Sequence, residues 1–100
     1  VDAGVGGKAA IEVGRKLASV SKSAQVVVVT HLPQVAVWAN NHLMVEKSDK
    51  GDVIESSVFP VTGEARATEI ARLLSGQEAS ETAREHAREL LELVGNSALR

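Results

Sequence analysis

Apolar residues recur at spacings of three and four in three stretches of the chain, which is the period of an amphipathic α-helix. The first stretch covers about residues 8–20, with apolar positions Ala10, Val13, Leu17 and Val20. The second covers about residues 64–75, with Ala67, Ile70, Ala71 and Leu74. The third covers about residues 81–94, with Ala83, Ala87, Leu90 and Val94. Gly76 should end the second helix and Gly95–Asn96 the third, because glycine is preferred just past a helix end. The pattern therefore predicts three helices.

An apolar run of a different kind follows the first helix. Gln25–Thr30 contains four consecutive valines without alternation, so both faces of a strand here should be buried. Such strands lie inside parallel sheets and need parallel neighbours, which the rest of the sequence does not supply. We therefore expect an interior strand whose partners lie upstream of Val1, in a larger α/β domain. Without those partners, Val26–Val29 would form an exposed, aggregation-prone edge.

The middle of the chain has the pattern of a short helix followed by a β-hairpin. Pro33 suits the first position of a helix, which should run to about residues 39–40. Two stretches with strand character, His42–Lys47 and Val53–Val61, flank the turn-forming cluster Ser48–Asp52. The expected order is therefore helix, buried strand, short helix, antiparallel hairpin and two further helices.

Composition and charge narrow the possible functions. The net charge is −2, so the chain as a whole does not attract nucleic-acid phosphates over long range. The absence of cysteine excludes disulfides, thiolate catalysis and cysteine-based zinc sites, and no His, Asp and Glu residues stand at convincing metal-ligand spacing. No apolar run approaches the ~18 residues of a transmembrane helix. Val1–Gly4 lacks both an initiator methionine and the basic segment of a signal peptide, so we expect a piece of a longer protein.

His31 is the strongest candidate for a chemical role. It directly follows the expected strand Gln25–Thr30, and ligands of open α/β sheets bind beyond the carboxyl ends of the strands. An imidazole there can donate a hydrogen bond to a phosphate oxygen. The structural alternative is that His31 caps the helix at Pro33 or bonds to a backbone carbonyl. We interpret His42 and His86 as structural, since one begins a strand and the other borders an apolar stripe.

Two glycine motifs match nucleotide-binding sequences only superficially. Gly4–Ala9 fits the G-x-G-x-x-G/A dinucleotide pattern, but the acidic residue that should end the next strand is replaced by Thr30–His31. A Walker A loop is excluded because the Gly-Lys pair is followed by Ala rather than by Ser or Thr. Leu74–Glu78 is one glycine short of the LSGGQ signature of ABC-type ATPases, and we interpret it as a helix end.

Two runs taken together resemble one protein family. Val1–Gly7, with its Asp-Ala-Gly-Val-Gly-Gly sequence, and Val28–Ala36, with Thr-His-Leu-Pro-Gln, are similar to the bacterial RecN proteins, relatives of the SMC (structural maintenance of chromosomes) and ABC ATPases. Ala71–Gly76 and Ala83–Leu91 resemble the end of that family. The resemblance covers essentially the whole chain. It implies one incomplete domain, the C-terminal part of a P-loop ABC/SMC-type ATPase head, with an antiparallel hairpin and two C-terminal helices.

The resemblance assigns roles to three residues. Asp2 and Gly4 match the D-loop, which contacts the nucleotide across the interface between two heads. His31 matches the switch histidine that approaches the γ-phosphate and the attacking water. ATP and Mg²⁺ would be held mainly upstream, by the Walker A loop, the Q-loop, the signature motif and the Walker B Asp and Glu, with that Glu directly before Val1. The family assigns no metal ligand within this chain, and the chain alone is expected to be inactive.

The function implied by the resemblance is ATP hydrolysis by an SMC-like protein in DNA double-strand break repair and recombination. The implied partners are a second ATPase head, as a homodimer, and DNA contacted through the rest of the protein. The implied location is the bacterial cytoplasm, associated with the nucleoid and without a membrane. Two alternatives stay open: a head of another SMC-like or ABC ATPase, and a non-catalytic interaction module that docks through the last two helices.

Overall fold

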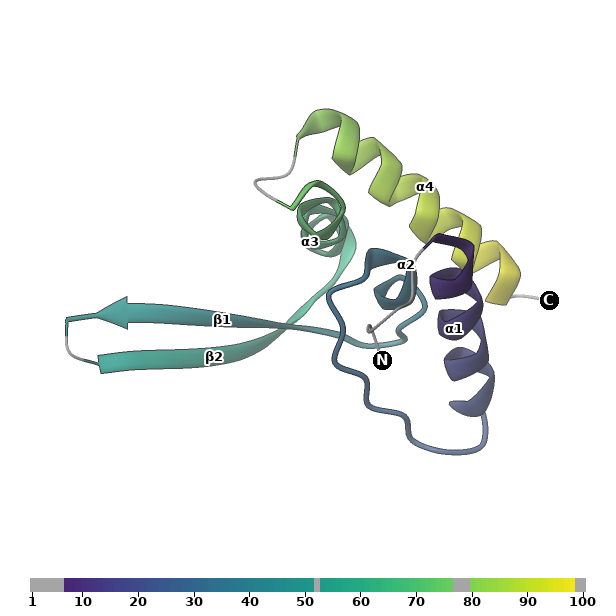
Figure 1. The fold of residues 1–100 in the computed structure, drawn as a ribbon, viewed down its shortest axis with the longest axis horizontal. Coiled ribbons are helices and arrows are strands. Elements are labelled where there is room, and N and C mark those ends of the chain that lie inside the picture. Colours follow the sequence, from purple (N-terminus) through teal and green to yellow (C-terminus); the bar gives the residue numbers. More distant parts are fainter. Residues whose placement is uncertain (1–6, 52, 77–79, 99–100) are drawn as a thin grey trace.

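The computed structural model describes residues 7–51, 53–76 and 80–98 of the chain. Its elements are α1 (Gly7–Val20), α2 (Pro33–Ala36), β1 (His42–Lys50), β2 (Val53–Val61), α3 (Gly63–Ser75) and α4 (Glu81–Ala98). The helices group at one end of the molecule, and the hairpin of β1 and β2 projects from them to one side (Figure 1). The described residues thus form a small α/β unit.

The predicted hairpin is confirmed. β1 and β2 pair antiparallel, from His42 opposite Val61 at the base to Lys50 opposite Val53 at the tip. The turn is tighter than expected, because the predicted turn residues Ser48, Asp49 and Lys50 also pair with β2. Gly51 follows with a φ of 66°, a left-handed conformation that glycine adopts without steric cost.

The prediction of a strand at Gln25–Thr30 is wrong for the residues that the structure describes. These residues form no strand, and the side chains of Val27 and Val29 are 83% and 89% exposed. A strand exists through hydrogen bonds to a neighbouring strand, and within the described ranges β1 and β2 pair only with each other. The segment therefore keeps the composition of an interior strand but is irregular, with Val27 and Val29 at the surface and Val26 and Val28 half-buried.

The core lies where α2, α3 and α4 meet. Ile70 and Ala71 of α3 and Ala87 of α4 are fully buried, and Val37 beyond α2 is 3% exposed. These residues confirm the apolar stripes predicted for the two last helices. The alanines at the contact between α3 and α4 let the two helices approach closely, which suits a core built from small aliphatic side chains.

The end of α3 and the start of α4 are set by the residues at those positions, whereas the predicted end of α4 is not observed. Gly76 ends α3 in a left-handed conformation with a φ of 72°, and its N–H donates to the Arg72 carbonyl at 2.9 Å. Ser80 caps α4, since its hydroxyl accepts a hydrogen bond from the Ala83 N–H at 3.1 Å. The predicted stop at Gly95–Asn96 is wrong, because α4 continues to Ala98. One interior glycine costs only about 1 kcal/mol relative to alanine, which does not by itself end a helix.

Candidate functional site

His31 lies on the irregular segment that leads from α1 into α2, two residues before the first residue of α2. Its side chain is exposed. Beside it, the Leu32 N–H donates to Thr30 Oγ1 at 3.0 Å, a local bond that fixes the backbone on both sides of His31. Pro33 then opens α2 with a restrained φ. The backbone is therefore anchored around an imidazole that solvent and ligands can reach.

The other two predicted site residues, Asp2 and Gly4, lie outside the described residues. Their D-loop assignment stays a prediction, and so does their relation to His31. The first described residue, Gly7, begins α1, so the predicted helix after the glycine-rich segment is confirmed.

α1 approaches α2 very closely from one side. A Cβ added at Gly14 would lie 2.2 Å from Trp38 Cδ1 and 3.1 Å from the Gln34 carbonyl oxygen. Only a residue without a side chain fits between these atoms. The neighbouring Ala10 on the same face of α1 is fully buried. The contact between α1 and α2 thus holds one side of the short helix that follows His31.

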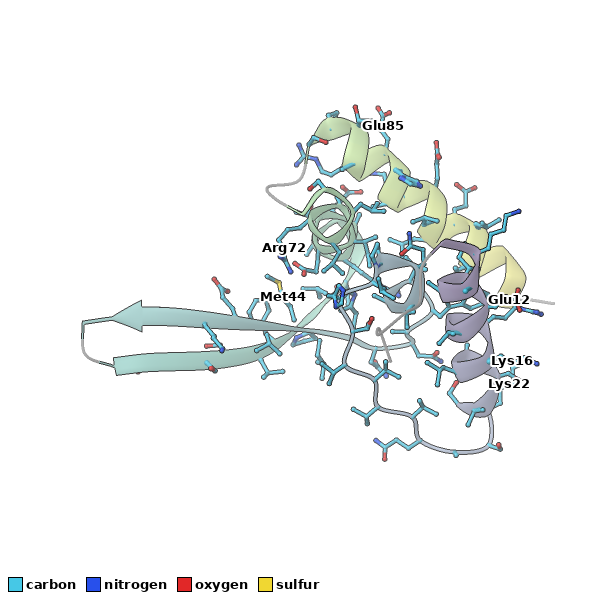
Figure 2. All side chains as sticks on the ribbon, viewed as in Figure 1. Glu12, Lys16, Lys22, Met44, Arg72 and Glu85 are labelled. Carbon is cyan, nitrogen blue, oxygen red and sulfur yellow. The ribbon has the colours of Figure 1, made fainter. Side chains whose placement is uncertain are left out.

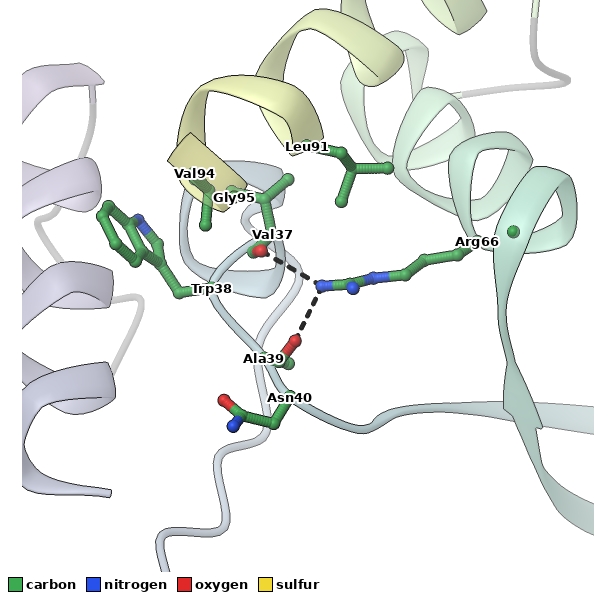
Figure 3. A pocket seen from close by; sticks show the side chains of 9 residues that line it. Val37, Trp38, Ala39, Asn40, Arg66, Leu91, Val94 and Gly95 are labelled. Atoms are coloured by element: carbon green, nitrogen blue, oxygen red, sulfur yellow. Dashed lines mark hydrogen bonds between the residues drawn. The ribbon is translucent and has the colours of Figure 1, made fainter. Parts of the chain in front are cut away.

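Arg66 of α3 holds the other side of α2 (Figure 3). Its Nη2 donates to the carbonyls of Val37 at 3.1 Å, Ala39 at 2.9 Å and Ala36 at 3.4 Å. Carbonyls at a helix C-terminus lack partners within the helix, and a guanidinium satisfies several of them at once. Burial lowers the pKa of Arg66, but a guanidinium stays charged in the physiological range. A cation from α3 therefore fixes the C-terminal end of α2.

A cavity of about 370 Å³ lies next to this contact (Figure 3). Its lining residues are Val37, Trp38, Ala39, Asn40, Gly63, Arg66, Leu91, Val94 and Gly95. The Nε1 of Trp38 and the Nε of Arg66 are buried donors without a hydrogen-bond partner among the described residues. His31 is not among these lining residues, so the cavity does not extend the His31 site.

The base of the hairpin carries a second polar group. Glu69 of α3 is 6% exposed and accepts a hydrogen bond from Arg72 Nε at 3.0 Å, with a second bond from Arg72 Nη2. Nearby, burial lowers the pKa of His42, and the positive charge of Arg66 lowers it further while Glu69 opposes the shift. The Nδ1 atom of His42 is buried without a hydrogen-bond partner within the described ranges. These contacts support the structural interpretation of His42.

The lowered pKa of His42 predicts a pH dependence of stability. The unfolded chain takes up a proton near pH ~6.5, whereas the folded chain resists protonation until lower pH. Its contribution to stability is therefore complete above that pH and falls as the pH drops below it. Denaturant unfolding between pH 5 and 8 should show a decline at acidic pH that His42→Gln reduces, while His86→Gln on the exposed side of α4 leaves it unchanged. Equal pH profiles for wild type and His42→Gln would contradict this assignment.

Comparison with known proteins gives one consistent result. No family model matches the chain. The chain is 63% identical to the DNA repair protein RecN of Streptomyces coelicolor over 92 residues, which are 92% of the chain and 16% of that protein. It is 50% identical to RecN of Mycobacterium tuberculosis over 99 residues, 99% of the chain and 16% of the relative. It is 52% identical to RecN of Deinococcus radiodurans over 91 residues, 91% of the chain and 16% of the relative.

The chain belongs to the RecN family. It spans about a sixth of the length of the curated RecN relatives that it matches. Within the part of this RecN-family chain that the structure describes, no helix is both long and apolar enough to cross a bilayer. The same described residues bring together no group of three His, Asp or Glu side chains that could hold a metal ion.

Sequence reasoning missed the contacts that hold α2 in this RecN-family chain. Arg66 precedes the buried Ile70 by four residues, so helical spacing already places it on the buried face of α3. An arginine at such a position needs acceptors, and the carbonyls of α2 supply them. For Gly14, the interruption of the buried face of α1 by a glycine was the available signal. The partner residues, by contrast, are distant in sequence and gave no signal.

Proposed function

We propose that the chain is part of the ATPase head of a RecN-type DNA repair protein and supplies its switch histidine, His31. The observation that carries the proposal is the identity of 40–63% to proteins named DNA repair protein RecN, over 91–99% of the chain. These names support a role in DNA repair. The ATPase role rests on the Thr-His-Leu-Pro-Gln run around His31 and on the glycine-rich run that contains Asp2 and Gly4.

The geometry around His31 suits a part in phosphoryl transfer. Catalysis of that reaction depends on positioned groups and on charge stabilisation around the phosphate rather than on covalent chemistry by the protein. His31 is exposed, and α2 behind it is held by Trp38 against Gly14 and by Arg66. We propose that the imidazole donates to a γ-phosphate oxygen and helps to orient the attacking water.

The remaining parts of such a site would come from elsewhere in the longer protein. Mg²⁺ would be bound outside the described residues, which gather no cluster of metal-ligating side chains. Asp2 and Gly4 would contact a nucleotide held by a second head, so the working unit is a dimer of heads. DNA would be bound through other parts of the protein. We propose that the ATPase belongs to the P-loop ABC/SMC class and acts in the cytoplasm near the nucleoid.

The alternative, that the chain is a non-catalytic docking module, has less support than the ATPase role. A module that docks through α3 and α4 would leave their apolar stripes open. Here Ala87 is fully buried, and Leu90 and Val94 pack against the core of the same chain. The apolar stripes of the two helices therefore pack internally, while Leu93 of α4 stays 59% exposed.

Alanine at His31 tests the proposal in the full-length protein. We expect ATP turnover to fall by roughly 10²-fold or more, because one charge-stabilising donor at a reaction centre is typically worth that much. Nucleotide binding should be retained, since the residues that grip the phosphates lie elsewhere. His86→Ala, an exposed histidine on α4, is the matched control and should leave turnover unchanged. Steady-state hydrolysis and nucleotide titrations measure both quantities.

A folded His31→Ala protein with normal turnover would contradict the proposal and favour a passive module.

The 100-residue chain by itself is expected to hydrolyse no ATP, because it lacks the Walker A and Walker B groups. Nucleotide turnover by the pure chain would show that the site is assembled differently.

A further inference from the structure

The cavity beside the C-terminal end of α2 contains a cation that no described acid neutralises. Arg66 is the one charged residue among the residues that line this cavity. Its Nη2 atom donates to backbone carbonyls, but no described residue accepts a hydrogen bond from its Nη1 atom, which carries two N–H groups. Unlike the Nε atom of the same side chain, Nη1 is not buried. Two charged donors of Arg66 are therefore open to a ligand.

The other arginines that the structure describes are paired with carboxylates. Figure 2 shows Arg72 on the side of α3 that faces Met44 of the hairpin, and Arg72 donates there to Glu69 at 3.0 Å. The remaining pairs join Arg15 to Glu12, Arg84 to Glu81 and Arg88 to Glu64. Arg66 is therefore the one described arginine without an acid partner.

A half-buried cation without an anion beside it is costly. Burial lowers the pKa of Arg66, which shows that its charged form has lost hydration. The carbonyls at the end of α2 replace part of that hydration, but they carry no net charge. An anion within hydrogen-bonding distance of the guanidinium would compensate for more of it. The cavity therefore favours an anionic ligand over a neutral or cationic one.

Most of the remaining cavity wall is apolar (Figure 3). Val37 lines it beyond α2, and Leu91 and Val94 line it from α4. Gly63 and Gly95 contribute backbone only, and a Cβ at either glycine would meet no atom within 4 Å. The volume of about 370 Å³ lies near the lower end of the range of small-molecule sites. The wall therefore suits a compact apolar group next to the anionic one.

We propose that this cavity binds a carboxylate attached to a compact apolar group, as in a short arylalkyl acid or an aliphatic residue at the C-terminus of a peptide. The carboxylate would accept hydrogen bonds from Arg66 Nη1, and the apolar group would lie against Leu91 and Val94. Inorganic phosphate would bind more weakly, because it offers no group to cover the apolar wall. The inference goes beyond the proposed ATPase role and does not depend on it.

Isothermal titration calorimetry with hydrocinnamate and the full-length protein tests this inference. We expect the acid to bind about tenfold more tightly than its neutral amide or more, because only the acid forms a charged pair with Arg66. Equal affinities for the acid and the amide, or no binding of the acid, would overturn the inference. A tripeptide that ends in leucine with a free carboxylate identifies the source of the ligand. Tighter binding than hydrocinnamate would assign a peptide C-terminus, and weaker binding would assign a small molecule.

Two substitutions test whether the acid binds in the cavity. Arg66→Met removes the cation, and Gly95→Leu places a side chain where the cavity has room for it without changing Arg66. Leucine favours a helix more than glycine does, so the second variant should fold. Each variant should weaken hydrocinnamate binding by about tenfold or more. The matched controls are Arg15→Met on α1 and His86→Leu, which by helical spacing lies on the opposite side of α4 from Gly95.

Both controls should leave the affinity for hydrocinnamate unchanged. An unchanged affinity in Gly95→Leu would overturn the inference, even if Arg66→Met binds more weakly. Binding should also persist in His31→Ala, because His31 does not line the cavity. Loss of hydrocinnamate binding in His31→Ala would place the carboxylate at the nucleotide site and overturn the inference. ATP turnover is measured separately, so the failure of this inference and the failure of the ATPase proposal can be told apart.

Discussion

Alanine in place of Gly14 is expected to destabilise the chain by about 1–2 kcal/mol, although this substitution in a helix interior normally stabilises. The new Cβ would lie 2.2 Å from Trp38 Cδ1, well inside van der Waals contact, and 3.1 Å from the Gln34 carbonyl oxygen. Neither neighbour is the free end of a flexible side chain. The helix-propensity gain of roughly 0.5–1 kcal/mol is therefore outweighed by an overpacking cost of about 1–3 kcal/mol.

Gly95 provides the matched control for this prediction. It also lies inside a helix, but a Cβ there would meet no atom within 4 Å. Gly95→Ala should therefore stabilise by about 0.5–1 kcal/mol through helix propensity alone. Thermal unfolding followed by circular dichroism should move the two melting temperatures in opposite directions. A Gly14→Ala chain as stable as wild type would show that α1 and α2 do not pack this closely.

Elements specified by their own residues could be predicted from the sequence. The apolar stripes of α3 and α4 were identified from helical spacing, and Ile70, Ala71 and Ala87 on them are fully buried. The ends at Gly76 and Ser80 follow from the conformation of one residue and the hydroxyl of another. The hairpin was predicted because turn-forming residues separate two strand-like runs. In each case the determining interactions span a few residues.

The predictions that failed have two kinds of cause, a neighbouring strand that is missing and a local propensity cost that is too small to end a helix. Gln25–Thr30 has the composition of an interior strand, but strand formation requires a neighbour that the described chain does not offer. At Gly95–Asn96 a local stop signal was overridden, because a modest propensity cost does not end a long helix. Local reasoning could locate His31 beside the start of α2, but it could not show that Trp38 and Arg66 hold that helix. Those contacts join residues more than twenty positions apart in sequence.

Methionine in place of Arg66 should destabilise the chain by about 1.5–3 kcal/mol, because charged hydrogen bonds to the C-terminal carbonyls of α2 are lost while the apolar stem is kept. The carbonyls of Val37 and Ala39 would face a partly closed cavity without their donor. Chemical denaturation measures the stability, and hydrogen exchange should show the greatest loss of protection in α2 and the residues after it.

Arg15→Met separates this effect from the loss of a surface charge. Arg15 pairs with Glu12 on the exposed side of α1, where screening by solvent leaves an ion pair little effect on stability. A loss of stability in Arg66→Met no larger than in Arg15→Met would refute a structural role for the contact with α2.

If His31 serves phosphoryl transfer, Arg66→Met in the full-length protein should also lower kcat with little change in KM, because α2 sets the position of the loop that carries His31. A change confined to KM would instead assign Arg66 to nucleotide binding.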